Sequence, residues 1–599
     1  MNAELKRAFI LRPSSFILLV VPLLLYFTLA LPQLDLPGLH NDEVVEAGLQ
    51  AQQILSGQPV TVFRDTGLAF GNRTFPWMVQ DYIGALNVYL LLPFFAALGP
   101  TVFALRLYTV LIGAATIACA YGFLAYSVGR RPAWVAAMLL AVSPSFVFWQ
   151  RQGVFVMSLT STLAMAALWV GAVWARRGGW RWMALLGLLC GLGLYAKLLF
   201  VWIIGGMIGA VVVVNLPLAL RILNSQFSIH NSRLTLFQRL LGVRSLISNL
   251  QSLVFFPRIP SLADCAGFAV GLLLGLLPLI AYNLQTGGTL LSVGANLTRS
   301  YYGVNNLNVA ENLRGRIDQF QAVLAGRDHL WYLGGSFGNP GWETALRIAA
   351  LAIGLRALLL RQRSQLPLAL LLLLALSVFQ TSFTVSGLFP THFALFAPLW
   401  PIVIALACEI VFDPFYEPLM IHLNGPPLST FMGSIISGWV GFLNVGMVIL
   451  TFALGGLWVR DVAVTVDYHR ALNASGGLGP HSDAVYRLAD YLESNGGVSV
   501  AAMDWGFAPQ VKMLTGGQVA PQEIFGYTWE PDEGFSDRLR AVTADPAALL
   551  VFHFPQETIF PRREAFDSFI AAQGWQAEQI AVISRRDGGP IFEIVRMKK

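Results

Sequence analysis

The sequence predicts a mainly α-helical polytopic membrane protein: a bundle of about 11 transmembrane helices with one interfacial or re-entrant segment, followed by a soluble α/β domain. Two observations predict this fold class. First, 56% of the 599 residues are hydrophobic and 12% are charged, with a mean hydropathy of +0.62, which excludes an ordinary soluble protein. Second, 18 of the 33 acidic residues follow residue 460, where the long apolar runs stop.

Apolar runs recur throughout the first 460 residues. A helix needs about 20 predominantly apolar residues to span the hydrocarbon core of a bilayer. We therefore expect membrane helices at 16–34, 102–127, 132–150, 153–175, 182–198, 200–220, 263–284, 344–361, 366–386, 393–412 and 432–458. These helices define a predicted transmembrane domain over residues 1–460.

Arginine-rich loops set the expected orientation. Basic residues cluster at 130–131, at 176–181 and through 221–262, where no acid occurs. Cytoplasmic loops carry such an excess, so the formal net charge of +6 needs no nucleic-acid partner. The loops 35–75 and 285–343 and the C-terminal domain then lie outside a bacterial-type plasma membrane. The segment 221–262 alternates arginine with apolar residues, so we expect an amphipathic helix on the inner leaflet or a flexible loop.

The run 75–98 is ambiguous. It is hydrophobic, but Asp81, Gly84 and Asn87 interrupt it. A full span here would invert every later loop and put the arginine-rich loops outside. We therefore expect a re-entrant or interfacial helix, or half of a tight hairpin.

The C-terminal residues 461–599 alternate helical and strand-like patterns. Residues 483–492 have amphipathic spacing, and strands are expected at 498–503, 549–552 and 592–595. No glycine-rich phosphate loop, metal-ligand spacing or nucleophile turn occurs in this region. We expect a soluble extracytoplasmic α/β domain with a structural or acceptor-binding role.

Adjacent acids, Asp42 and Glu43, follow the first apolar helix. At about 100° per residue they share one helical arc with Glu46, Gln50 and Gln53. Such a helix can lie flat on the bilayer and hold carboxylates over the headgroups. Helix capping is the alternative, and it explains one acid more easily than three.

Several short motifs occur in an order that matches a known family. The acidic pair Asp42-Glu43 is followed by the segment 104–108, by Ser143-Pro144 with Arg151, and by 191–197, which reads Gly-Leu-Gly-Leu-Tyr-Ala-Lys. The segment 390–393 adds a weaker match. In this order the chain resembles the GT-C superfamily of polytopic glycosyltransferases, closest to the branch of protein O-mannosyltransferases and lipid A aminoarabinose transferases. The resemblance implies a polyprenyl-phosphate-linked sugar as donor and an inverting transfer to a lipid, glycan or protein.

Asp42 is the expected catalytic base, because a carboxylate within hydrogen-bond reach of an acceptor hydroxyl can take its proton. Glu43 is expected to orient it or to hold a cation. A divalent ion such as Mg²⁺ or Mn²⁺ on this pair is chemically reasonable but not required. The chain also departs from relatives at 72–76 and 154–157, where they often carry further acids, and this puts a metal site in doubt.

Lys197 and Arg151 are the expected ligands of the donor phosphate. A lysine inside an apolar run costs about 2.5–3.5 kcal/mol at mid-bilayer, which favours a functional role over snorkelling at a helix end. For Arg151, at the outer end of its helix, phosphate binding and headgroup anchoring are equally favoured.

The loop 285–343 is rich in aromatic and amide side chains, among them Tyr301, Tyr302 and His329. This composition suits sugar binding and equally suits a membrane-interface belt. Two other classes compete with the transferase: a lipid or glycolipid transporter, or a non-catalytic membrane scaffold. Transporters commonly contain paired repeats with broken helices, and none is visible here.

Overall fold

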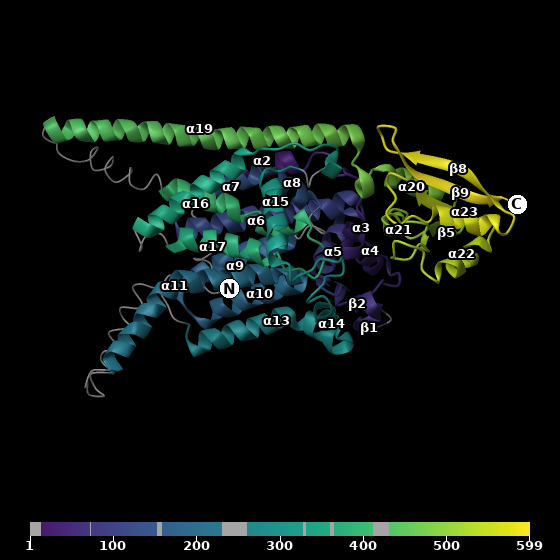
Figure 1. Ribbon diagram of the computed structural model, residues 1–599, viewed down its shortest axis with the longest axis horizontal. Helices are drawn as coiled ribbons and strands as arrows, with labels where there is room; N and C mark the ends of the chain where they lie inside the picture. Colours follow the sequence, from purple (N-terminus) through teal and green to yellow (C-terminus); the bar gives the residue numbers. More distant parts are fainter. Residues whose placement is uncertain are drawn as a thin grey trace.

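The computed structural model describes residues 13–71, 73–152, 158–230, 260–327, 331–359, 365–410 and 430–598. Figure 1 shows a bundle of helices with the C-terminal domain, coloured yellow, at one end. The bundle helices are α2 Pro13–Ala30, α6 Val102–Ser127, α7 Arg130–Val142, α8 Pro144–Arg151, α9 Ser158–Arg177, α10 Trp180–Ala196, α11 Val201–His230, α13 Leu262–Thr286, α16 Gly341–Leu359, α17 Gln365–Gln380 and α19 Thr430–Ser475. Shorter elements at the domain end are α3 Asn41–Glu43, α4 Leu49–Ser56, α5 Leu86–Leu98, α14 Gly288–Ala295 and α15 Val309–Leu324.

Each predicted membrane segment carries a helix, but the number that crosses the bilayer stays a prediction. Within the described ranges, five helices are long and apolar enough to span, or seven if each bent pair is counted as one span. One bent pair is α7 and α8, which meet at 64° because Pro144 starts a new helix after Ser143. The other joins Pro390–Phe396 to Leu399–Ile410 at 47°. The predicted inner-leaflet helix in 221–262 lies mostly outside the described residues.

Helices α10 and α13 pack closely because glycines line their contact. A Cβ on Gly271 would lie 1.9 Å from the carbonyl oxygen of Ala184, and one on Gly187 would lie 2.1 Å from that of Phe268. Small residues spaced four apart let helix backbones approach in this way. Gly275 continues the same row. This contact fixes the position of the C-terminal end of α10, where Lys197 lies.

The ambiguous run 75–98 is not one helix. Its first part, up to residue 84, contributes strands to two small hairpins. In the first hairpin β1 Gly67–Phe70 pairs with β2 Arg73–Pro76, and in the second β3 Met78–Gln80 pairs with β4 Ile83–Gly84. Only α5, with 13 residues, is helical, and it packs beside α6 across the turn at Gly99. At about 1.5 Å per residue α5 is about 20 Å long, too short to span alone.

Helix α19 connects the bundle to the C-terminal domain (Figure 1). It has 46 residues and continues through the predicted boundary at 460/461, so the sheet-bearing part begins beyond Ser475. Asp461 fastens it to the bundle by accepting hydrogen bonds from Asn339 Nδ2 at 2.7 Å and Trp342 Nε1 at 2.8 Å.

The C-terminal domain is a five-stranded sheet of order β6-β5-β7-β9-β8 with helices on both faces. The predicted strands are β5 Val500–Ala502, β7 Leu549–His553 and β9 Pro590–Lys598; β6 Gln522–Glu523 and β8 Gln576–Ser584 complete the sheet. β5 pairs in parallel with β6 and β7, and β9 pairs antiparallel with β7 and β8. The helices are α20 Ala484–Ser494, α21 Ala508–Leu514, α22 Phe535–Thr543 and α23 Arg563–Ala571.

One hydrophobic core joins this domain to the bundle. Apolar residues of α20 and α21 pack with Val44, Ala47 and Leu105 of the membrane-side elements. Gln52 Nε2 donates to the carbonyl of Met513 at 3.0 Å, and the Tyr486 hydroxyl donates to that of Asp35 at 2.7 Å. The domain therefore docks directly on the segment that contains the predicted catalytic acids.

Candidate active site

Arg106 of α6 organises the loop that leads to the two acids. Its side chain is fully buried, and Nη1 donates to the carbonyls of Leu34 at 2.8 Å and Pro37 at 2.7 Å. Nε and Nη2 bind the two carboxylate oxygens of Glu43 at 2.9 and 2.8 Å. A fork of guanidinium donors on a carboxylate gives strong geometric control. The loop is thereby held at one position over the start of α6.

Arg151, the last residue of α8, contacts the same loop with its side chain. Its Nη2 donates to the carbonyls of Pro32 at 2.7 Å, Leu36 at 3.2 Å and Gln33. The side chain is 1% exposed and lies over the Phe148 ring. Arg151 holds the loop through Nη2 and is not among the residues that line the cavity described below, so its contact with the donor phosphate stays a prediction.

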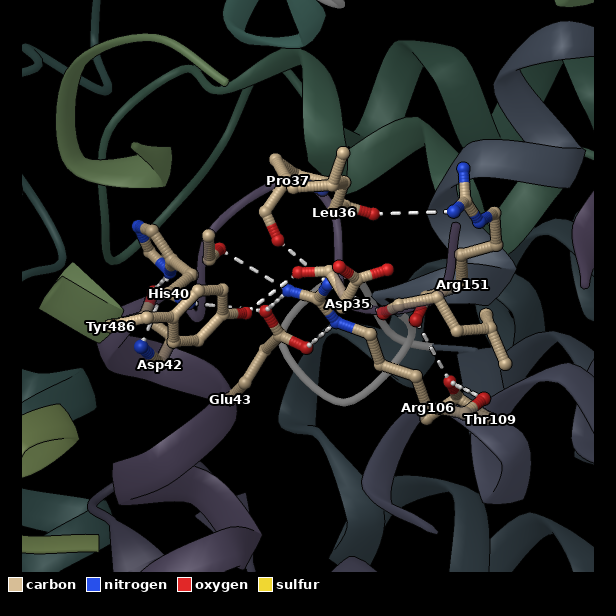
Figure 2. Close-up of polar contacts among 12 residues, drawn as sticks. Asp35, Leu36, Pro37, His40, Asp42, Glu43, Arg106, Thr109, Arg151 and Tyr486 are labelled. Carbon is tan, nitrogen blue, oxygen red and sulfur yellow. Dashed lines mark hydrogen bonds and ion pairs between the residues drawn. The ribbon is translucent and has the colours of Figure 1, made fainter. Parts of the chain in front are cut away.

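Asp42 and Glu43 have different surroundings, and Figure 2 shows the Glu43 carboxylate against the guanidinium of Arg106. Glu43 Oε1 accepts from Arg106 and from the backbone N–H of His40 at 3.2 Å, which closes a capping box with the His40 ring on the N–H of Asp42. Both Glu43 oxygens are therefore in use inside the protein. The Asp42 side chain is 34% exposed and faces a cavity.

The segment that carries these acids is largely buried within the protein. A π-helical turn, Val44–Gly48, interrupts it, so the assumed 100° spacing fails there. Glu46 is 3% exposed, and Gln50 and Gln53 are also buried. Burial raises the pKa of Glu46 to about 8, Lys197 lowers it in part, and Asp42 raises it further.

The cavity beside Asp42 has a volume of about 930 Å³. Its walls come from residues 41–82, from α14 and the loop after it, from the loop before Pro390–Phe396, and from the C-terminal domain. The lining residues are Asn41, Asp42, Val45, Leu49, Gln50, Thr61, Val62, Phe63, Arg64, Val79, Gln80, Asp81, Tyr82, Ser292, Asn296, Tyr301, Tyr302, Val385, Ser386, Trp505, Ala508, Pro509, Lys512, Pro521, Glu523 and Tyr527.

Tyr301 and Tyr302 both line this cavity, as a sugar-binding role requires. They stack edge to face with centroids 5.1 Å apart, and their loop is anchored by Asn306, which donates to the carbonyl of Thr384 at 2.8 Å. Burial raises the pKa of Tyr302, and the Asp42 carboxylate adds to this, so the two groups interact across the cavity. His329, the third residue predicted from this loop, lies outside the described residues.

Lys197 lies at the end of α10 and is not among the residues that line this cavity. Its backbone forms an isolated bridge with Ile83, and the next residue donates its N–H to the carbonyl of Tyr82 at 2.9 Å. Its ammonium group acts on Glu46, which in turn interacts with Asp42. The structure therefore brings Lys197 near the acids, with Glu46 as the intermediate group, but not onto the cavity surface.

Arg64 and Asp81 are cavity residues that sequence reasoning did not select. Arg64 Nη2 lies 2.6 Å from Asp81 Oδ2, and the Tyr282 hydroxyl donates to Asp81 Oδ1 at 2.6 Å. Arg64 and Asp65 both have positive φ, at 52° and 51°, a costly backbone conformation for residues with side chains. Asp81 could have been found as the charged residue within an apolar run, whereas Arg64 carries no comparable signal.

The C-terminal domain also contributes side chains that the sequence did not indicate. Trp505 packs edge-on against His40, with centroids 6.1 Å apart. Lys512 on α21, Glu523 on β6 and Tyr527 complete that wall. No local pattern in the sequence reports these positions, because only docking of the domain brings them to Asp42.

A divalent ion on the Asp42-Glu43 pair does not fit this geometry. Arg106 and the His40 N–H occupy the Glu43 oxygens, which leaves one carboxylate of the pair for a cation. In the part of the chain that the structure describes, no group of three or more His, Cys, Asp or Glu side chains could hold a metal.

Known proteins share this architecture. A family model described as dolichyl-phosphate-mannose-protein mannosyltransferase matches residues 85–229. A search of curated proteins gives no match. The structure of ArnT from Cupriavidus metallidurans bound to undecaprenyl phosphate is similar at a TM-score of 0.51 and 14% identity, covering 97% of each chain; its apo state gives 0.51 and 12%.

The chain has the GT-C fold. The resemblance found in the sequence is thereby confirmed, including a mainly helical membrane domain followed by a C-terminal sheet. The apo oligosaccharyltransferase of Archaeoglobus fulgidus is also similar, at a TM-score of 0.49 and 14% identity, covering 90% of this chain and 69% of that one. In this GT-C fold the cavity lies where residues 41–82 meet the C-terminal domain.

Proposed function

We propose that this protein is a membrane glycosyltransferase that moves a sugar from a polyprenyl-phosphate donor to an acceptor hydroxyl at the outer face of the membrane. The observation that carries the proposal is the position of Asp42, a partly exposed carboxylate on the wall of a cavity of about 930 Å³. The matched mannosyltransferase family and the undecaprenyl phosphate bound to ArnT support this class of donor.

Asp42 acts as the general base. It accepts the proton of the acceptor hydroxyl as that oxygen bonds to the anomeric carbon of the donor sugar. The bond from this carbon to the phosphate oxygen breaks, and polyprenyl phosphate leaves with the bonding electrons. Attack opposite the leaving group inverts the anomeric centre. Glu43, through Arg106, positions Asp42 and has no direct part in the transfer.

Positive charge near the leaving phosphate comes from Arg64 and Lys512, which both line the cavity. The predicted pair, Arg151 and Lys197, is not among the residues that line this cavity, so their contact with the phosphate stays a prediction. Charged donors are the stronger ligands for phosphate oxygens. Arg64 remains paired with Asp81 on one nitrogen, which fixes the direction of its guanidinium.

We infer the orientation of the protein in the membrane from the two ends of α6. Arg106 near its start belongs to the cavity end, whereas Ser127 at its last turn accepts a hydrogen bond from Arg176 at 2.7 Å. Arg176 belongs to the arginine-rich loops that should be cytoplasmic. The cavity and C-terminal domain then face the extracytoplasmic side of the cell membrane.

The test is to incubate the purified protein with polyprenyl phosphates that carry a radiolabelled hexose or pentose. We expect time-dependent release of polyprenyl phosphate, with the Michaelis constant for donor raised by Arg64→Ala and by Lys512→Ala. Arg470→Ala is a matched control, since Arg470 is an exposed arginine paired with Asp467 on α19. Absence of donor consumption across the panel would contradict the proposal.

A further inference from the structure

The C-terminal wall of the cavity combines exposed aromatic rings with a carboxylate. Tyr527 is 58% exposed and Tyr301, on the opposite loop, is 72% exposed, yet both line the same cavity. Large aromatic side chains that stay exposed inside a polar cavity are available to a ligand. Trp505 adds a third ring from the C-terminal domain.

These rings are held in place. The Tyr527 ring packs against the buried Phe525 ring with centroids 4.9 Å apart, and its hydroxyl donates to Glu523 Oε2 at 2.6 Å. Tyr301 lines the same cavity. Burial, and then Glu523, raise the pKa of Tyr527, and Tyr301 adds to this. A ring fixed at its edge leaves its face available at little cost in side-chain entropy.

The C-terminal wall of the cavity also lies next to Asp42, the proposed general base. Trp505 contacts His40, whose ring nitrogen caps the N–H of Asp42. α21 packs on the π-helical turn and on α4, so its residues lie beside the segment that carries Asp42. A ligand seated on Trp505 and Tyr527 can therefore present a hydroxyl to the Asp42 carboxylate.

Sugars match this surface chemically. A pyranose ring has C–H faces that pack on aromatic rings and a rim of hydroxyls that donate to carboxylates. We propose that the C-terminal domain forms the acceptor subsite and that the acceptor is a saccharide, free or part of a glycolipid, whose ring packs on Tyr527 and Trp505 and whose hydroxyls bind Glu523. This inference rests on the proposed transferase function and assigns the acceptor class, which that function leaves open.

The experiment measures binding of full-length protein to an array of immobilised oligosaccharides, in a detergent without a sugar headgroup. We expect the wild type to bind a subset of glycans, and we expect Tyr527→Ala and Glu523→Gln to weaken that binding at least about tenfold. Tyr527→Phe keeps the ring and should lose less than Tyr527→Ala. Trp529→Ala is the matched control: Trp529 is two residues away, exposed, and packed near Phe560.

A second measurement separates this inference from the proposed function. Release of polyprenyl phosphate by the wild type, with water as acceptor and no glycan present, tests the transferase function without using the acceptor subsite. Glycan binding that is absent in the wild type, unchanged in Tyr527→Ala, or equally reduced in Trp529→Ala overturns the acceptor subsite, as does transfer of label to a peptide. Loss of donor release from the wild type itself would instead contradict the transferase function and leave the glycan-binding result to stand alone.

Discussion

Asp42 and Glu43 are neighbours in the sequence, but their side chains meet different surroundings. Glu43 is 1% exposed and lies against the guanidinium of Arg106, whereas Asp42 keeps a face toward the cavity. Buried ion pairs of this kind stabilise only as a pair, since loss of one partner leaves an uncompensated charge. Glu43 therefore stabilises the loop, whereas Asp42 is available for chemistry in the cavity.

Glu43→Gln should accordingly destabilise the fold by about 3–5 kcal/mol, because it leaves the buried Arg106 charge without its carboxylate. Asp42→Asn should change the free energy of unfolding by less than about 0.5 kcal/mol. Denaturant or thermal unfolding in detergent measures both. Equal stability of the two variants would show that the Arg106 pair does not hold the loop.

Glu46 gives a pH-dependent stability. Burial raises its pKa from the ordinary value of 4.5 to about 8, so the folded state keeps a proton that the unfolded chain releases above pH 4.5. Stability from this group is complete below pH 4.5 and falls as pH rises toward 8, by up to about 1.4 kcal/mol per pH unit. Glu46→Gln should flatten this slope in thermal unfolding measured across that window. Parallel slopes for variant and wild type would rule out a buried neutral Glu46.

For single residues, the sequence predicted part of the candidate site. Asp42, Tyr301 and Tyr302 were selected from local composition, and the structure brings all three to one cavity. Arg151 was selected because it is charged at a membrane boundary, but the carbonyls that it binds belong to a loop more than 110 residues earlier. Long-range partners of this kind leave no trace in local sequence patterns.

Helices were the most predictable elements, because apolar length and hydropathy determine them directly. Three features escaped prediction: the 64° bend between α7 and α8, the hairpins before α5, and the π-helical turn at Val44–Gly48. The bend follows locally from Pro144, whereas the hairpins and the π-helical turn depend on packing against other parts of the chain. The π-helical turn, for example, lies under α21 of the C-terminal domain.

The glycine contact between α10 and α13 makes a prediction at the scale of elements. Gly271→Leu should separate the helices, since even its Cβ would lie 1.9 Å from the Ala184 carbonyl oxygen. We expect destabilisation of more than about 3 kcal/mol and lower donor turnover, because the position of Lys197 at the end of α10 shifts. Gly354→Ala, where a Cβ meets nothing within 4 Å, is the control and should be neutral or slightly stabilising. Similar unfolding curves for the two variants would contradict this account of the contact.

The candidate active site lies at the end of the helical bundle that carries the C-terminal domain. Residues 41–82, the loop after α14 and the C-terminal domain line the cavity. Arg176 contacts Ser127, at the opposite end of α6 from Arg106. The composition predicted a membrane bundle and a soluble domain, but it did not predict that they share one hydrophobic core. Because of this shared core, the C-terminal domain forms one wall of the cavity.

Orientation can be tested in intact cells. A cysteine at position 540, exposed on α22, should react with a membrane-impermeant maleimide from outside, and a cysteine at position 177 should react only after the membrane is opened. Both are introduced in a background lacking the native cysteines. Labelling of position 540 only from the cytoplasm would invert the topology and place the cavity inside the cell.

The central claim is that Asp42 removes the acceptor proton during sugar transfer. The most direct measurement compares wild type and Asp42→Asn for transfer of label from a polyprenyl-phosphate sugar, with unfolding temperature measured on the same samples. The account predicts a loss of about 10²–10⁴-fold in turnover with little change in unfolding temperature. Transfer by Asp42→Asn at the wild-type rate would contradict it.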